Sequence, residues 1–389
     1  MVWTHFGRRL VGNLTTITSS WRIFSVGLLG FHWCNQLCRD AHPVDKQRVL
    51  QEHFLRYEQL AAYLRSSAGD HEIMGITRVR KRLGESRRTI EIGTNQRSLI
   101  LSDQVSYGIW GLYSTALRET GLVRGDFREL TDRGLEIVHL IEDGLTRKGD
   151  GLGIGWYWSF LRGDRNAVAV ADLEHESKRF TRAISARKVK NALIAALLRG
   201  SGEHRCQLAL YEACQALPKL VLEEAGLGDL IATIRQQSES PELHQVLDDV
   251  SQIERLLVTA NVLFNYLRRQ DGEPLAPLAE AIDRIYRFDD LPVGPELADV
   301  PYGMDLETLR ARLRGGDTLG ALRCLLDMNK EIMAGRGGAA WVEEAGDGRL
   351  RVRVKAETAH LPPMDELQSR WDYDYFLRSF ARIAAMERR

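Results

Sequence analysis

Four residues near the N-terminus carry side chains of the kind that bind structural zinc: His32, Cys34, Cys38 and His42. Zinc sites of this type arrange their cysteine and histidine ligands as a tetrahedron, with close pairs held across a turn. Here Cys34, Cys38 and His42 would instead lie along one face of a helix, and His32 would be badly placed to close the tetrahedron. We therefore expect buried thiols, no bound metal and no cofactor.

A second polar cluster, Asp172-Leu173-Glu174-His175-Glu176, brings carboxylates next to an imidazole. Such a set could ligate a metal ion or serve as acid and base in catalysis. No further acidic cluster at a strand end completes a site of this kind. The pattern is more typical of the solvent-exposed beginning of a helix.

Arg48 and His53 have the spacing Arg-x4-His, and Arg199 and His204 repeat it. This spacing resembles the active-site pattern of HEPN-type ribonucleases, and the resemblance implies metal-independent cleavage of RNA. Chance matches are expected because arginine is abundant in the chain, so this spacing alone does not identify a nuclease. A ribonuclease toxin is kept as an alternative function.

Residues 71–145 combine basic side chains with a regular order of predicted elements. A short helix over 75–83 precedes a longer one that Ser102-Asp103 can cap and that ends at Gly121. Two short strands follow around a tight Gly125-Asp126 turn, and Thr131-Asp132 caps the next helix. The candidate nucleic-acid-binding residues in this segment are Arg78, Arg80, Lys81, Arg82, Arg124 and Arg128.

The run Gly121-Leu122-Val123, followed by Leu130-Thr131-Asp132-Arg133-Gly134, resembles the wing and post-wing helix of bacterial winged-helix proteins. In that family the helix before the wing enters the DNA major groove, and basic residues at the wing touch phosphates. The resemblance implies DNA binding by this segment. The helix before the wing departs from the pattern, because it is rich in aromatic residues and poor in lysine and arginine. Phosphate contact and protein docking therefore remain equal alternatives.

A second basic stretch, Lys178-Arg179-Phe180-Thr181-Arg182, continues through Arg187-Lys188-Val189-Lys190. It could extend a phosphate-binding surface, because each neutralised phosphate adds salt-dependent affinity. A run of this kind is more often the solvated side of an amphipathic helix, which is the interpretation we favour from the sequence.

Composition limits the classes of function. The chain of 389 residues has 53 Lys and Arg against 53 Asp and Glu, so any polyanion site must arise from local clustering of cations. Five cysteines are an odd number and favour reduced thiols in a cytoplasmic protein. The apolar stretch 23–38 is too short to span a bilayer, so we expect no membrane association.

Helical periodicity dominates and predicts a mainly α protein: a bundle-like helical body, a winged-helix-like module and a small C-terminal β-hairpin. The hairpin is expected after Asp347-Gly348, where Leu350, Val352 and Val354 alternate with basic residues. We divide the chain into an N-terminal helical segment (1–70), the winged-helix-like module (71–150), a helical domain (151–335) and a hairpin with a final helix (336–389).

The function expected from these features is that of a non-enzymatic, nucleic-acid-associated subunit, with DNA favoured over RNA and with other protein subunits as partners. The Asn13-Leu14-Thr15-Thr16 opening, the Trp110 to Tyr113 segment and the Trp371 to Phe376 tail faintly resemble bacterial proteins from phage-defence or mobile-element clusters. A purely structural adaptor is a further alternative.

Overall fold

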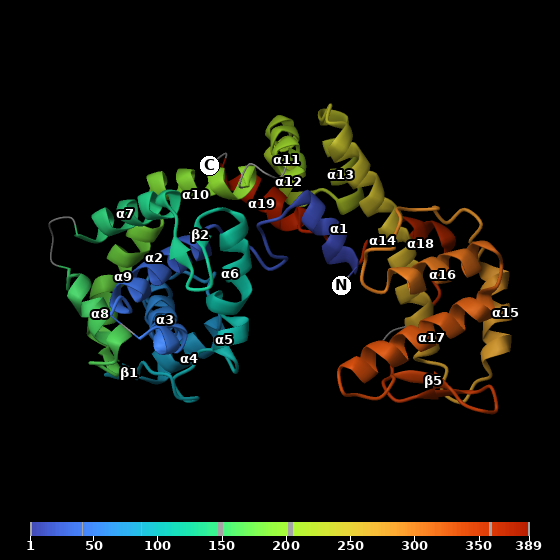
Figure 1. Ribbon diagram of the computed structural model, residues 1–389, viewed down its shortest axis with the longest axis horizontal. Coiled ribbons are helices and arrows are strands. Elements are labelled where there is room, and N and C mark those ends of the chain that lie inside the picture. The colour runs from blue at the N-terminus through green and yellow to red at the C-terminus, as the bar shows by residue number, and fades with distance from the viewer. Residues whose placement is uncertain are drawn as a thin grey trace. The chain divides into compact units, whose positions relative to one another are not determined.

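The computed structural model describes residues 2–40, 42–86, 88–146, 151–200, 205–357 and 360–387. Its internal contacts divide the chain into two compact units (Figure 1). Unit 1 consists of Met1–Leu10 and Ala225–Leu377, and unit 2 of Val11–Glu224 and Arg378–Arg389. The protein is mainly helical with small antiparallel strand pairs, which confirms the predicted fold class.

Unit 2 holds most of the elements considered below. They are α2 (Arg22–Leu37), α3 (Pro43–Ser67), α4 (Ile76–Glu85), β1 (Thr89–Glu91), α5 (Gln104–Tyr107), α6 (Ile109–Glu119), β2 (Val123–Arg124), β3 (Glu129–Leu130), α7 (Asp132–Thr146), α8 (Ile154–Arg162), β4 (Ala167–Ala169), α9 (Val170–Ile184), α10 (Arg187–Arg199), α11 (Arg205–Ala216), α12 (Lys219–Glu224) and α19 (Leu377–Glu387).

Unit 1 is built around one long helix, α14. Its elements are α1 (Val2–Leu10), α13 (Leu227–Gln237), α14 (Pro241–Leu267), α15 (Leu275–Ile285), α16 (Gly303–Arg314), α17 (Thr318–Gly335), β5 (Val342–Glu344), β6 (Leu350–Val352) and α18 (Met364–Ser369).

The strands form separate two-stranded antiparallel sheets. The β2–β3 hairpin pairs Val123 with Leu130, and Gly125 in its turn has a φ of +65°, which glycine adopts without strain. The β5–β6 hairpin pairs Glu344 with Leu350. Both were expected from the sequence. β1 was not, and it pairs with the distant β4 through Ile90 and Val168.

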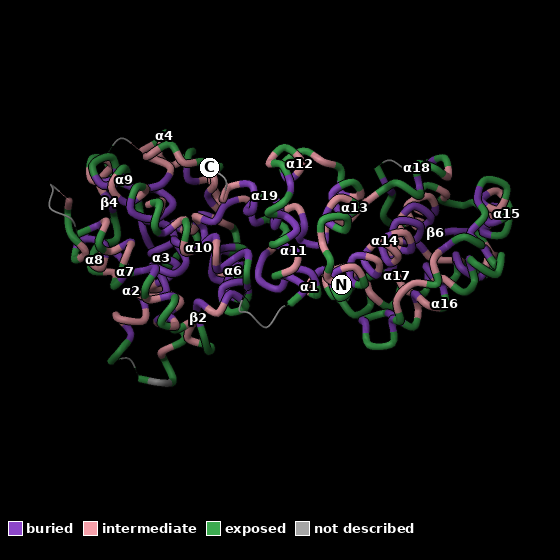
Figure 2. The backbone as a smooth tube through the Cα atoms, turned by 90° about the horizontal axis from the view of Figure 1, so that it is seen from above, coloured by how far each residue is buried: buried purple, intermediate pink, exposed green. Residues whose placement is uncertain are grey.

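Helix α3 forms the centre of unit 2 and packs against α2, α8 and α9. The apolar stripe predicted for it is buried, including Phe54, Tyr57, Leu60 and Leu64. Phe54 stacks on Phe31 of α2 with ring centroids 4.4 Å apart. Figure 2 shows the buried backbone concentrated along such central helices.

The single helix expected from 103 to 121 is divided in two at Gly108, which has an extended backbone. Glu58 of α3 takes the place of the missing helical acceptor, because its Oε1 accepts a hydrogen bond of 2.6 Å from the backbone N–H of Ile109. A Cβ at position 108 would lie 2.6 Å from the Glu58 carboxylate. The break thus depends on a glycine and on a distant carboxylate, which helical periodicity does not reveal.

The two ends of the chain belong to units that the sequence order does not predict. In unit 1, α1 packs on α14, and Trp3 stacks on Tyr373 with centroids 5.5 Å apart. In unit 2, Tyr211 of α11 donates a hydrogen bond of 3.0 Å to Glu387 of α19. The four sequential segments expected from the sequence therefore differ from the two compact units, because packing of apolar faces joins stretches far apart in the chain.

Among the helices that the structure describes, none combines the length and the apolar character needed to cross a bilayer.

Candidate nucleic-acid interface

The four cations of α4 divide into two that are used inside unit 2 and two that face solvent. Arg78 donates to the carbonyl of Leu99 at 3.0 Å. Arg82 donates to the carbonyl of Ser98 at 2.7 Å and to the Tyr63 hydroxyl at 3.1 Å. Both hold the 97–99 loop against α4, so they are not available to phosphates.

The two exposed cations of α4 have weaker local contacts. Arg80 hydrogen-bonds the ring of His71. The Lys81 ammonium is 3.9 Å from Glu85, and its side chain is 71% exposed. These two side chains are free to reach an external anion.

The β2–β3 hairpin carries one exposed and one inward-facing arginine. Arg124 is exposed. Arg128 lies with its guanidinium 3.7 Å from the centroid of the Trp110 ring and donates a 2.6 Å hydrogen bond to the Ser114 hydroxyl. Burial lowers the pKa of Arg128 to about 10. Arg128 therefore anchors the hairpin to α6.

The structure does not bring the six predicted residues together. Figures 1 and 2 both show α4 and the β2–β3 hairpin well apart, on opposite sides of unit 2. The helix before the hairpin, α6, buries Trp110 and Tyr113 in the core. The exposed cations Arg80, Lys81 and Arg124 thus belong to separate surfaces.

The two side chains of the candidate nuclease pair on α3 also do not point toward each other. Arg48 is exposed and donates to Glu52 at 2.8 Å and to Asp45 at 3.3 Å. Residues five apart on a helix point about 140° away from each other. Burial lowers the pKa of His53, which is turned toward Leu161 of α8. Of the second pair, His204 lies outside the described residues.

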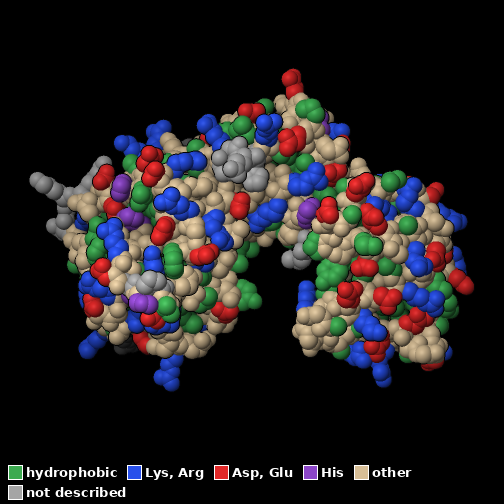
Figure 3. All heavy atoms as spheres, in the orientation of Figure 1, with side chains coloured by type: hydrophobic (Ala, Val, Ile, Leu, Met, Phe, Trp, Pro, Cys, Tyr) green, Lys and Arg blue, Asp and Glu red, His purple; other side chains and the backbone are tan. Residues whose placement is uncertain are grey.

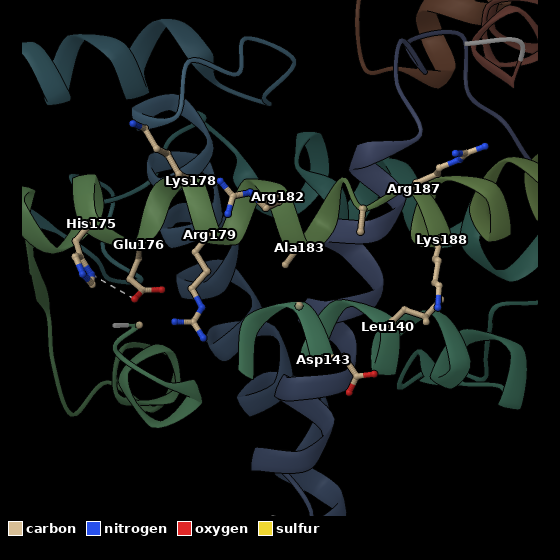
Figure 4. Close-up of a pocket in the computed structure, with 13 residues that line it drawn as sticks. Leu140, Asp143, His175, Glu176, Lys178, Arg179, Arg182, Ala183, Arg187 and Lys188 are labelled. Atoms are coloured by element: carbon tan, nitrogen blue, oxygen red, sulfur yellow. Dashed lines mark ion pairs between the residues drawn. The ribbon is translucent and has the colours of Figure 1, made fainter. Parts of the chain in front are cut away.

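A different basic cluster lines a groove where α9 and the beginning of α10 cross α7, with a volume of about 670 Å³ (Figure 4). We call it the cationic groove. Five cations line it together with two carboxylates and His175, and small or aliphatic residues complete the walls. The cations are Lys178, Arg179, Arg182, Arg187 and Lys188.

Four of these five cations face solvent: Lys178, Arg182, Arg187 and Lys188. Within the described part of the chain, no acidic group lies within ion-pair distance of any of them. The fifth, Arg179, hydrogen-bonds the carbonyl of Leu145 in the last turn of α7, where a cation is favourable for the exposed carbonyls.

Two small residues in the wall of the groove let α7 and α9 approach each other. A Cβ on Gly144 of α7 would lie 3.0 Å from the Cβ of Ala183 of α9, so the two helices pack closely there. Figure 4 shows Arg179 and Lys188 pointing from α9 and α10 toward α7, whereas Lys178, Arg182 and Arg187 point away from it. The groove thus has cations on the side near α7 and on the side away from it.

The polar cluster at 172–176 lies near the beginning of α9, as the sequence pattern suggested, but it is only partly exposed. His175 is exposed at the rim, but Glu176 is buried. The Glu176 carboxylate accepts hydrogen bonds from the Leu152 backbone N–H at 2.6 Å and from the Tyr157 hydroxyl at 3.0 Å. Glu176 thus anchors the segment before α8. In the described part of the chain, no cluster of three His, Cys, Asp or Glu side chains is placed to hold a metal ion.

From the sequence, the basic run from 178 to 190 was expected to be the solvated side of an amphipathic helix. The sequence does not show that α7 packs beside this run and forms a groove with it. The i, i+4 pair Lys178 and Arg182 would repel on an isolated helix, and this like-charge spacing is the signal in the sequence that marks the cluster. Elsewhere, Figure 3 shows basic and acidic side chains interspersed on the face in view.

No protein-family model, no curated protein and no solved structure matches this chain.

Proposed function

We propose that the protein is a non-enzymatic, nucleic-acid-associated subunit that binds DNA phosphates in the cationic groove. The observation that carries the proposal is the set of four exposed cations along one groove, none of which has an acidic partner among the residues that the structure describes, in a chain whose formal net charge is zero. Phosphate contacts release condensed counterions, so such a cluster supplies affinity that does not depend on base sequence.

The winged-helix-like module has a supporting role in this proposal. Arg78, Arg82 and Arg128 hold the module together, and α6 turns its aromatic face inward. These observations favour protein docking over base readout at the module, which is the second candidate role. We also propose that the protein associates with other protein subunits, in a bacterial defence system or in another complex.

The test compares two triple variants that remove the same number of exposed cations. One carries Lys178→Ala, Arg182→Ala and Arg187→Ala in the groove, and the other Arg80→Ala, Lys81→Ala and Arg124→Ala in the winged-helix-like module. Fluorescence anisotropy follows a labelled DNA duplex with a single-stranded tail across a salt series. Circular dichroism checks that each variant is folded.

We expect the groove variant to weaken binding and to flatten the salt slope by up to about one unit per lost contact. The module variant should keep the slope of the unmodified protein. A flattened slope in the module variant with an unchanged slope in the groove variant would place the interface at the winged-helix-like segment. Absence of binding by the unmodified protein at low salt would overturn the proposal.

A further inference from the structure

We infer that the cationic groove receives a single-stranded segment of nucleic acid rather than a duplex. The inference rests on the proposed function and names the class of ligand for the same groove. It is carried by the size of the groove and by the way its cations are spread along it.

Size is the first argument. The groove has a volume of about 670 Å³, which is within the range of pockets that hold a molecule of about drug size. A DNA duplex is wider than its own major groove of about 12 Å. A short stretch of one strand can therefore lie in the groove, whereas a duplex can touch only its edge.

The arrangement of cations is the second argument. Lys178 and Arg182 come from the second half of α9, and Arg187 and Lys188 from the first turn of α10. In Figure 4 these side chains are spread along the groove, not gathered around one point. A row of this kind follows successive phosphates of one strand, as in grooves that track a single-stranded backbone.

The wall residues determine how a strand in the groove would be recognised. Among the described residues that line the groove, none is Phe, Tyr or Trp, and His175 at the rim has the only ring side chain. Stacking of bases on aromatic rings is the usual source of base-dependent affinity in single-strand sites. Recognition in this groove is therefore by phosphate, tolerant of sequence and strongly dependent on salt.

The experiment uses the full chain and two labelled probes, an oligothymidine of about 20 nucleotides, which exceeds most single-strand site sizes, and a blunt duplex of the same length. We expect roughly tenfold tighter binding of the single strand, the effect of one or two additional charge-assisted contacts. The variant Lys188→Ala, which removes a cation pointing toward α7, should weaken oligothymidine binding several-fold and leave duplex binding nearly unchanged.

The control variant Arg80→Ala removes an exposed cation from α4 and should change neither affinity. If the duplex binds as tightly as the single strand, and the groove triple variant weakens both, the protein binds nucleic acid at the groove but the single-strand inference is wrong. If neither probe binds at low salt, the proposed function fails as well. A competing homopolymer of different base should displace oligothymidine equally; strong base preference would contradict recognition by phosphate.

Discussion

Glu58 is a carboxylate buried at the centre of unit 2, where it takes part in a network of polar side chains. Its two oxygens accept hydrogen bonds from the Ile109 backbone N–H and from the Gln104 side-chain amide, at 2.6 and 2.8 Å. The side-chain amide of Gln59 makes two hydrogen bonds with the backbone of Gly93: it donates to the carbonyl and accepts from the N–H. Together these side chains tie α3 to the stretch that leads into α6. Burial raises the pKa of Glu58 to about 7.

This pKa predicts a specific pH dependence of stability. The folded-state pKa of Glu58 is above the ordinary value of about 4.5 for a glutamate, so the folded state holds the proton more tightly. This contribution to stability is lost as pH rises from about 4.5 through 7. The difference in unfolding free energy between Glu58→Gln and the unmodified protein should therefore shift in favour of the variant by about 3 kcal/mol between pH 4.5 and pH 8.

Urea denaturation at a series of pH values measures this difference. Glu136→Gln, at an exposed position of α7, is the matched control and should show no such shift. An equal free-energy difference at both ends of the pH range for Glu58→Gln would show that the carboxylate does not titrate there.

At the scale of elements, the β2–β3 hairpin has two arginines with opposite roles. Arg128 has a φ of +54° in the left-handed region, and this backbone directs its side chain onto Trp110 and Ser114 of α6. Asn35 of α2 also donates a 3.0 Å hydrogen bond to the Phe127 carbonyl. The hairpin is thus held by polar contacts from two helices, while Arg124 extends into solvent.

We predict that Arg128→Ala lowers the free energy of unfolding by about 2 kcal/mol, because it removes a partly buried cation–π contact and two hydrogen bonds. Arg124→Ala in the same hairpin should change stability by less than about 0.5 kcal/mol. Urea midpoints of the two variants provide the comparison. Comparable midpoints for both would mean that the contacts of Arg128 contribute little.

Helices α7, α9 and α10 together place a basic run of the sequence along a groove. α9 buries Leu173, Phe180 and Ile184 and leaves its basic side chains at the surface. α7 supplies Gly144, which lets the helices approach. The cations are then spaced along a concave surface instead of a convex helix face, and their fields add within it.

At the scale of the whole molecule, the chain passes between its two units three times, after Leu10, Glu224 and Leu377. Each unit therefore closes its core with a terminal segment. The last segment of unit 1 is held by Glu254 of α14, which accepts hydrogen bonds from the Tyr373 backbone N–H at 3.0 Å and from the Tyr375 hydroxyl at 2.6 Å. Burial raises the pKa of Glu254.

The reactivity of the cysteine thiols can show whether the core of each unit is closed. Cys34, Cys38, Cys206 and Cys214 are buried in unit 2, and Cys324 is partly exposed in unit 1. Reaction with a thiol reagent requires access and a thiolate. Burial raises the pKa of Cys34 and of Cys324.

We expect one thiol to react first in the folded protein, in a phase that Cys324→Ser abolishes, and the other four to react at rates limited by opening of unit 2. A chromogenic disulfide reagent, with and without urea, measures the two phases. Several thiols reacting rapidly without urea would indicate that the unit 2 core opens more readily than its burial implies.

The amino-acid sequence by itself determined the features that repeat over short distances. The helical class, the apolar stripes of α3 and α14, the two hairpins and the basic run from 178 to 190 all follow from the spacing of neighbouring residues, because helix and strand periodicities are local. The tertiary structure decided which basic side chains are used in internal hydrogen bonds and which remain exposed to solvent. Arg78, Arg82 and Arg128 resemble Arg80 and Arg124 in sequence, yet their acceptors come from other elements, so long-range packing alone separates the structural cations from the exposed ones. The division of the helix at Gly108 and the groove at Gly144 have the same origin, since each requires a partner on a distant helix.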